Sequence, residues 1–197
     1  MCNKNETRKS LIKAGLSLFS QKGFHAVGIN EIVKLSDIPK GSFYNYFASK
    51  EVFVSEVLKT AALLNRKTIA ETGGSEDEVR LIISLLKEAV EKVEPEQAHS
   101  GLLFANNAGT LSQTSDALRN SLSVYIEESL ATIRLLLTRA QEKGSIRADL
   151  SVDQITTFFW DSWQGALLRA QVEQSAQPLH QVIEFVFEEF VYRTSIR

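Results

Sequence analysis

The sequence predicts an all-α protein with nine helices. Apolar residues recur every three or four positions along almost all of the 197 residues, and no segment alternates as a β-strand would. Gly, Ser, Asp and Pro residues interrupt this pattern at intervals and separate one helix from the next. An apolar fraction of 44% supplies a substantial core, so we expect the chain to fold without disulfides or metal ions.

The first fifty residues predict three helices. The first is longer and ends at Lys22-Gly23, and the other two are short and flank a turn at Ser36-Asp37. The expected inward faces are Ile12, Gly15, Leu16 and Phe19 in the first helix, Ile29, Ile32 and Val33 in the second, and Phe43 and Phe47 in the third.

The turn between the two short helices contains residues that favour a tight turn followed by a new helix. Asp37 tolerates a left-handed backbone, and Ile38 is expected to fill the corner behind it. Pro39 presets the first turn of the helix that follows. Residues 28 to 47 therefore predict a helix-turn-helix, a fold element that places its second helix in the major groove of DNA.

Six further helices are expected between residue 51 and the end of the chain. Breakers separate them at Gly73-Gly74-Ser75, Glu94-Pro95, Gly144-Ser145 and Gln177-Pro178. Serine side chains are expected to cap helix starts, and Gly144 to stop a helix. We place the boundary between head and body in the fourth helix and define two domains, residues 1–50 and 51–197. The predicted caps are Ser49, Ser75, Ser115 and Ser151.

Charge is distributed unevenly between these domains. The whole chain has a net charge of −2, but residues 1–50 hold eight Lys and Arg against three acidic residues, whereas the remainder has a net charge of −7. A basic head can attract phosphates although the whole protein is acidic. Chance segregation of charge is the alternative.

A family resemblance is carried by the segment Lys40-Gly-Ser-Phe-Tyr-Asn-Tyr-Phe-Ala-Ser-Lys-Glu51, after Gly23-Phe24 and Ile29-Asn-Glu-Ile32. This segment resembles the signature of the tetracycline-repressor (TetR) family, which most often has glycine where this chain has Asp37. The resemblance implies that the first three helices bind DNA and that the fourth connects them to the body. It also implies that the fifth to seventh helices enclose an inducer and that the last two form a dimer.

The resemblance further implies two groups of DNA contacts. Small and basic residues early in a recognition helix can reach base edges, while tyrosyl hydroxyls and a lysine suit phosphate oxygens. For Tyr44, packing against the fourth helix is the alternative. The base contacts are expected from Asn30, Lys40, Gly41 and Ser42, and the phosphate contacts from Tyr44, Tyr46 and Lys50.

An inducer site is expected where aromatic and amide side chains mix in the sixth to eighth helices, although an aromatic stripe at helical spacing is core more often than pocket. The chain also resembles a branch that includes electrophile-sensing repressors, in segments 140–149 and 163–170. Those sensors carry a cysteine at the start of the sixth helix, where this chain has Gly101, so a reversibly bound ligand is expected. The nominated ligand-binding residues are Phe104, Asn106, Asn107, Tyr125, Trp160 and Trp163.

The last two helices predict a homodimer. Apolar residues between Val182 and Phe190 occupy more than one helical face, which needs more cover than one subunit provides. A helix wholly buried within the monomer is the alternative. A twofold dimer would read a palindromic operator through two half-sites.

Other classes of function find little support. The three histidines lie far apart, no metal-binding or catalytic spacing occurs, and no leader or membrane span is expected, so we predict neither a cofactor nor an enzyme. Cys2, the single cysteine, fits a cytoplasmic protein. We expect a ligand-responsive transcriptional regulator that represses, with activation as an open alternative. A non-sensing DNA-binding protein and a helical enzyme are the competing classes.

Overall fold

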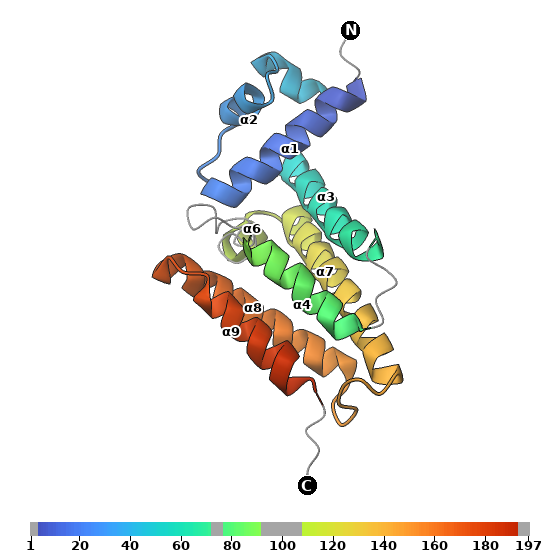
Figure 1. Ribbon diagram of the computed structural model, residues 1–197. Coiled ribbons are helices and arrows are strands. Elements are labelled where there is room, and N and C mark those ends of the chain that lie inside the picture. Colours follow the sequence, from blue (N-terminus) through green and yellow to red (C-terminus); the bar gives the residue numbers. More distant parts are fainter. Residues whose placement is uncertain (1–3, 72–76, 92–107, 193–197) are drawn as a thin grey trace. The chain divides into compact units, whose positions relative to one another are not determined.

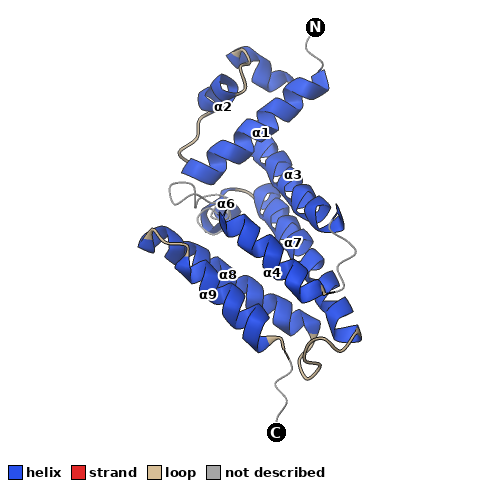
Figure 2. Cartoon of the chain, viewed as in Figure 1, coloured by secondary structure: helices blue, strands red, loops and turns tan. Residues whose placement is uncertain are grey.

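The computed structural model describes residues 4–71, 77–91 and 108–192, and within these ranges the chain is helical without strands (Figures 1 and 2). Counting η1 as the third helix and η2 as the continuation of α9, the described elements number nine, and the all-α prediction is confirmed. The fourth predicted helix is therefore α3. The elements are α1 Lys4–Lys22, α2 Ile29–Leu35, the 3-10 helix η1 Lys40–Asn45, α3 Lys50–Glu71, α4 Glu78–Glu91, α6 Ala108–Thr114, α7 Asp116–Glu142, α8 Val152–Glu173, α9 Gln177–Ile183 and the π-helical η2 Glu184–Phe190.

The chain forms two compact units, which differ from the predicted division at residue 50. The first unit comprises Met1–Leu64 and His99–Ile126, and the second comprises Asn65–Ala98 and Glu127–Arg197. Residues 51–64 of α3 and the start of α7 thus pack with the first fifty residues. The boundary at residue 50 separates residues predicted to bind DNA from residues predicted to bind a ligand and dimerise, and this division stays a prediction.

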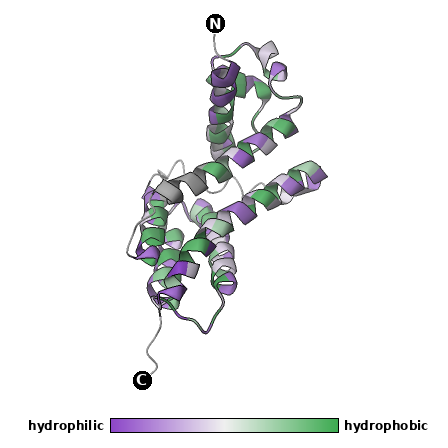
Figure 3. Cartoon of the chain, turned by 90° about the vertical axis from the view of Figure 1, so that its right-hand side faces the viewer, coloured by the Kyte–Doolittle hydropathy of each residue, from purple (hydrophilic) through white to green (hydrophobic). Residues whose placement is uncertain are grey.

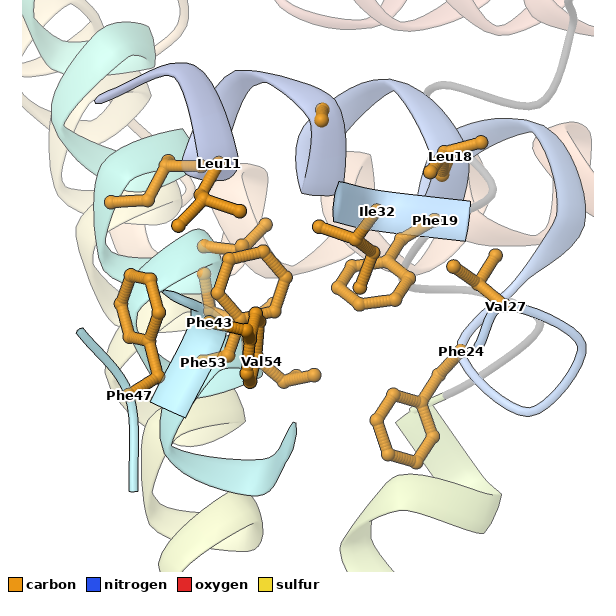
Figure 4. Close-up of a cluster of buried hydrophobic side chains, with 14 of the residues drawn as sticks. Leu11, Leu18, Phe19, Phe24, Val27, Ile32, Phe43, Phe47, Phe53 and Val54 are labelled. Carbon is orange, nitrogen blue, oxygen red and sulfur yellow. The ribbon is translucent and has the colours of Figure 1, made fainter. Parts of the chain in front are cut away.

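Phe53 lies at the centre of the core of the first unit (Figure 4). Its ring centroid is 4.8 Å from that of Phe47, 5.3 Å from that of Phe43 and 5.9 Å from that of Phe19. A Cβ atom at Gly15 would lie only 2.6 Å from Cζ of Phe53, so the close crossing of α1 and α3 requires glycine there. Residues from α1, η1 and α3 therefore share one aromatic core.

Three of the four predicted serine caps are present. The hydroxyl oxygens of Ser49 and Ser115 accept hydrogen bonds from the amides of Val52 (3.2 Å) and Leu118 (3.3 Å), and Ser151 forms a full capping box with Gln154. Ser75 lies outside the described residues.

The cap observed at the start of α4 is the Asp77 carboxylate, which accepts from the amides of Val79 and Arg80, both at 3.1 Å. Gly144, predicted to stop a helix, has φ of +72° just beyond the end of α7. A glycine with a left-handed backbone therefore follows the end of α7, as predicted.

The second unit has its own apolar core, and α8 packs along α9 within it. Figure 3 shows apolar and polar residues interleaved along the helices, which is the amphipathic pattern from which the helices were predicted. The core includes Val79, Ile82, Leu137, Ile146, Ile155, Phe159, Val186 and Phe187.

One carboxylate is buried at the edge of this second core. The Glu78 side chain is 6% exposed, and its Oε1 accepts a hydrogen bond from Nζ of Lys143 at 2.5 Å. Its Oε2 is also buried and has no hydrogen-bond partner. The Lys143 ammonium holds the pKa of the Glu78 carboxyl below its ordinary value, although burial acts in the opposite direction.

Acidification is expected to destabilise the second unit through Glu78. Because the folded-state pKa is below the unfolded-state value, the unfolded chain binds the proton more readily, and the contribution to stability is lost as the pH falls through the folded pKa. Thermal unfolding between about pH 7 and about pH 3 should show a smaller loss for Glu78→Gln than for wild type. Equal losses in both proteins would contradict this assignment.

Candidate nucleic-acid interface

The turn between α2 and η1 has the predicted geometry. Asp37 has φ of +53°, in the left-handed region, and the amide of Ile38 donates to the carbonyl of Val33 at 3.0 Å. Ile38 packs against the core of the first unit, and Pro39 directly precedes η1. The turn predictions at Asp37, Ile38 and Pro39 are therefore confirmed.

The second helical element is a 3-10 helix, and this changes which tyrosine faces the core. A 3-10 helix has three residues per turn, so residues three apart share a face. Phe43 is completely buried, and Tyr46, three residues later, packs partly buried against the same core. Tyr44 is 59% exposed, which argues against the alternative that its ring packs on the fourth helix.

Two of the four predicted base contacts are exposed. Asn30, in the first turn of α2, and Gly41, in η1, are exposed, and Ser42 is half-buried. Lys40 begins η1. Asn45, which the sequence did not predict as a contact, is also exposed on η1.

Gly41 has no structural need to be glycine. Its φ is not positive, and a Cβ atom added there would meet nothing within 4 Å. The open space contrasts with Gly15, where side chains of Phe53 and Val57 would meet an added Cβ atom. An exposed glycine with open space around it leaves room for another molecule to approach the backbone of η1 closely.

Lys50 does not extend into solvent. Its Nζ donates a hydrogen bond to the carbonyl oxygen of Phe24 at 2.7 Å and lies 4.1 Å from the centroid of the Phe24 ring. Burial lowers the pKa of the Lys50 ammonium. The residue expected to contact a phosphate is thus engaged within the first unit.

Five other cations of the head differ in whether they form ion pairs. Arg8, Lys9 and Lys22 form ion pairs with Glu56, Glu6 and Glu31 respectively. Among the described side chains, by contrast, Lys13 and Lys34 are exposed and make no ion pair or hydrogen bond. Lys34 follows Asn30 by one helical turn on α2, so both share a face. Sequence reasoning missed Lys34, although its spacing from Asn30 could have indicated it.

The residues predicted to bind an inducer do not belong to one unit. One lies in the first unit, two lie in the second, and the others lie outside the described residues. Tyr125 packs against the core of the first unit. Trp160 and Trp163 are half-buried in α8, and the Trp163 ring lies 5.7 Å from that of Phe159. Gly101, Phe104, Asn106 and Asn107 lie outside the described residues.

Within the described ranges, no group of His, Cys, Asp and Glu side chains is arranged to hold a metal ion. No helix in the same ranges is both long enough and apolar enough to cross a bilayer.

Comparison with known families identifies the chain. Residues 11–57 match the model of bacterial regulatory proteins of the tetR family, and residues 79–186 match the tetracyclin repressor-like C-terminal domain. The chain belongs to the TetR family. The N-terminal match includes the turn, η1 and every predicted DNA contact, so this TetR-family member is a DNA-binding transcriptional regulator.

Relatives and solved structures extend this similarity over nearly the whole chain. The transcriptional repressor DhaR of Mycobacterium sp. (strain GP1) is 33% identical over 92% of this chain and 90% of its own length. The transcriptional regulator AcuR of Cereibacter sphaeroides is 31% identical over 94% of this chain and 86% of its own length. The reduced form of E. coli NemR shares the TetR fold with a TM-score of 0.81 at 24% identity, over 97% of this chain and 100% of that chain.

Proposed function

We propose that this protein is a cytoplasmic repressor that binds a palindromic operator as a homodimer and is released from it by a small molecule. The observation that carries the proposal is the exposed η1 element after the left-handed turn at Asp37, within the matched segment 11–57. DhaR and NemR, which resemble the chain along most of its length, are themselves named as repressors.

The proposed base-reading surface consists of Asn30 on α2 and of Lys40, Gly41 and Ser42 on η1. Tyr44, which is exposed, supplies a phosphate contact, and Tyr46 contributes its hydroxyl while its ring packs on the core. Lys34, which is exposed and makes no ion pair with the described part of the chain, adds a cation on the Asn30 face. In this proposal the first group of residues reads the base sequence, and the tyrosines and Lys34 contact the phosphate backbone.

Replacing Gly41 with leucine is expected to weaken binding to DNA from upstream of the protein's own gene by about tenfold or more, because its side chain would hold η1 away from the bases. Stability should be unchanged, since the space is open. The affinity is measured by titration at low salt, with thermal unfolding alongside.

Gly109→Leu is the matched control, because Gly109 is also helical, exposed and without neighbours within 4 Å of an added Cβ. It should leave DNA binding unchanged. If wild type does not bind the upstream DNA at all, the proposed function is wrong.

The proposed dimer surface is the outward face of α8. Phe158, Leu168 and Val172 are exposed there, and Gly165, between them, has open space around it. Phe185 of η2 is exposed as well. Spacings of seven, three and four residues place the α8 positions on one stripe, which a second copy of the chain can cover by helix packing. The interface predicted for helices eight and nine therefore has the required apolar surface.

Release by a ligand requires coupling between the body and the DNA-binding helices. Leu118 and Leu122 of α7 belong to the same core as η1 and α3, and the Ser121 hydroxyl donates to that of Ser55 at 2.9 Å. A ligand that shifts α7 would therefore also shift α3. The two tryptophans of the chain both lie in α8, so their fluorescence can report ligand binding there.

A further inference from the structure

One contact in the first unit joins the two segments that flank the helix-turn-helix at residues 28 to 47. Phe24 precedes α2, and Lys50 is the first residue of α3, directly after the turn that follows η1. Although 26 positions separate them, Nζ of Lys50 donates to the carbonyl oxygen of Phe24 at 2.7 Å. The ammonium also lies over the Phe24 ring, 4.1 Å from its centroid. We call this pair of contacts the Phe24–Lys50 clasp.

The clasp supplies a hydrogen bond to the Phe24 carbonyl, which lies outside the hydrogen-bond pattern of the helices. Phe24 follows Gly23, where the backbone turns at φ of +76° after α1, and it lies in the connection between α1 and α2. A carbonyl in such a connection needs a donor, and Lys50 supplies a charged one. The Phe24 ring is itself buried and lies 5.9 Å from the Phe19 ring, so the clasp is anchored in the core.

We propose that Lys50 is a positioning residue, which fixes the start of α2 relative to the end of η1, rather than a residue that neutralises a DNA phosphate. The inference rests on the proposed function, since the parts it positions are the proposed base contacts on α2 and η1. Its ammonium is committed to Phe24, whereas Lys13 and Lys34 make no ion pair or hydrogen bond with any residue in the described ranges, which leaves them available to phosphates.

Lys50→Met removes the charge and the donor while keeping the length of the side chain. If Lys50 positions the base contacts, this variant should bind the upstream duplex about tenfold more weakly. Misplaced base contacts weaken only the binding that depends on base sequence. Affinity for a random-sequence duplex and the dependence of that affinity on salt should be unchanged. Lys50→Arg, which keeps a cation and donors, should restore most of the affinity. Lys13→Met is a control for loss of charge and should leave the ratio of the two affinities unchanged.

Two results would overturn the inference. If Lys50→Met weakens both duplexes equally and lowers the slope of log affinity against log salt by about 0.9 per phosphate, Lys50 is a phosphate contact. If neither affinity changes at a temperature where the variant is folded, the clasp contributes packing alone.

Hydrogen exchange in the absence of DNA tests the clasp independently of the proposed function. The amides of Glu31 and Ile32 both donate to the carbonyl of Gly28 at the start of α2, at 3.0 and 3.3 Å. Faster exchange of these amides in Lys50→Met, but not in Lys50→Arg, supports the clasp even if wild type fails to bind the upstream duplex. Unchanged exchange in Lys50→Met overturns it.

Discussion

Replacing Phe53 with alanine is expected to lower the free energy of unfolding of the first unit by about 3–5 kcal/mol. The Phe53 side chain is 0% exposed and contacts the rings of Phe19, Phe43 and Phe47. Its removal would leave a cavity where α1, η1 and α3 meet, and the surrounding rings cannot all move inward to fill it.

The measurement is chemical denaturation followed by circular dichroism. Val52→Ala is the control, since Val52 adjoins Phe53 but is 46% exposed, and its truncation should change the free energy by no more than about 0.5 kcal/mol. A loss below about 1 kcal/mol for Phe53→Ala would show that the core is not packed around this ring.

Replacing Leu168 with glutamate is expected to convert the proposed dimer to monomers and to weaken operator binding by about a thousandfold, because a monomer reads only one half-site. Leu168 lies on the exposed apolar stripe of α8. A carboxylate there would have to be buried between two subunits without a partner.

Leu135→Glu is a closely matched control, because Leu135 on α7 and Leu168 are both 51% exposed. Light scattering should give a dimer mass for the control and a monomer mass for Leu168→Glu. If both variants stay dimeric and bind the operator normally, the dimer forms through another surface.

The helix-turn-helix could be predicted from sequence because its determinants are local. The spacing of Phe43 and Phe47 indicated their burial, and the tolerance of Asp37 for a left-handed backbone indicated the turn. The roles of Tyr44 and Tyr46 could not be resolved in this way. They depend on whether η1 winds with three or with 3.6 residues per turn, and both forms suit the same residues.

Contacts between distant residues were beyond sequence reasoning. Nothing in the local pattern brings Lys50 to Phe24, or Lys143 to Glu78, since each pair is joined only by the packing of different elements. The residue that caps α4 was also difficult to predict from the sequence. Both Ser75 and Asp77 are good capping residues, and Asp77 is the cap observed at Glu78, where the helix begins.

The central claim is that a dimer of this protein reads DNA sequence through η1 and the start of α2. Hydroxyl-radical footprinting of wild type on its own upstream DNA tests this most directly. We expect two protected half-sites related by twofold symmetry, with centres about one helical turn or a whole number of turns apart. Protection spread evenly along the duplex, or a single unpaired half-site, would contradict the account.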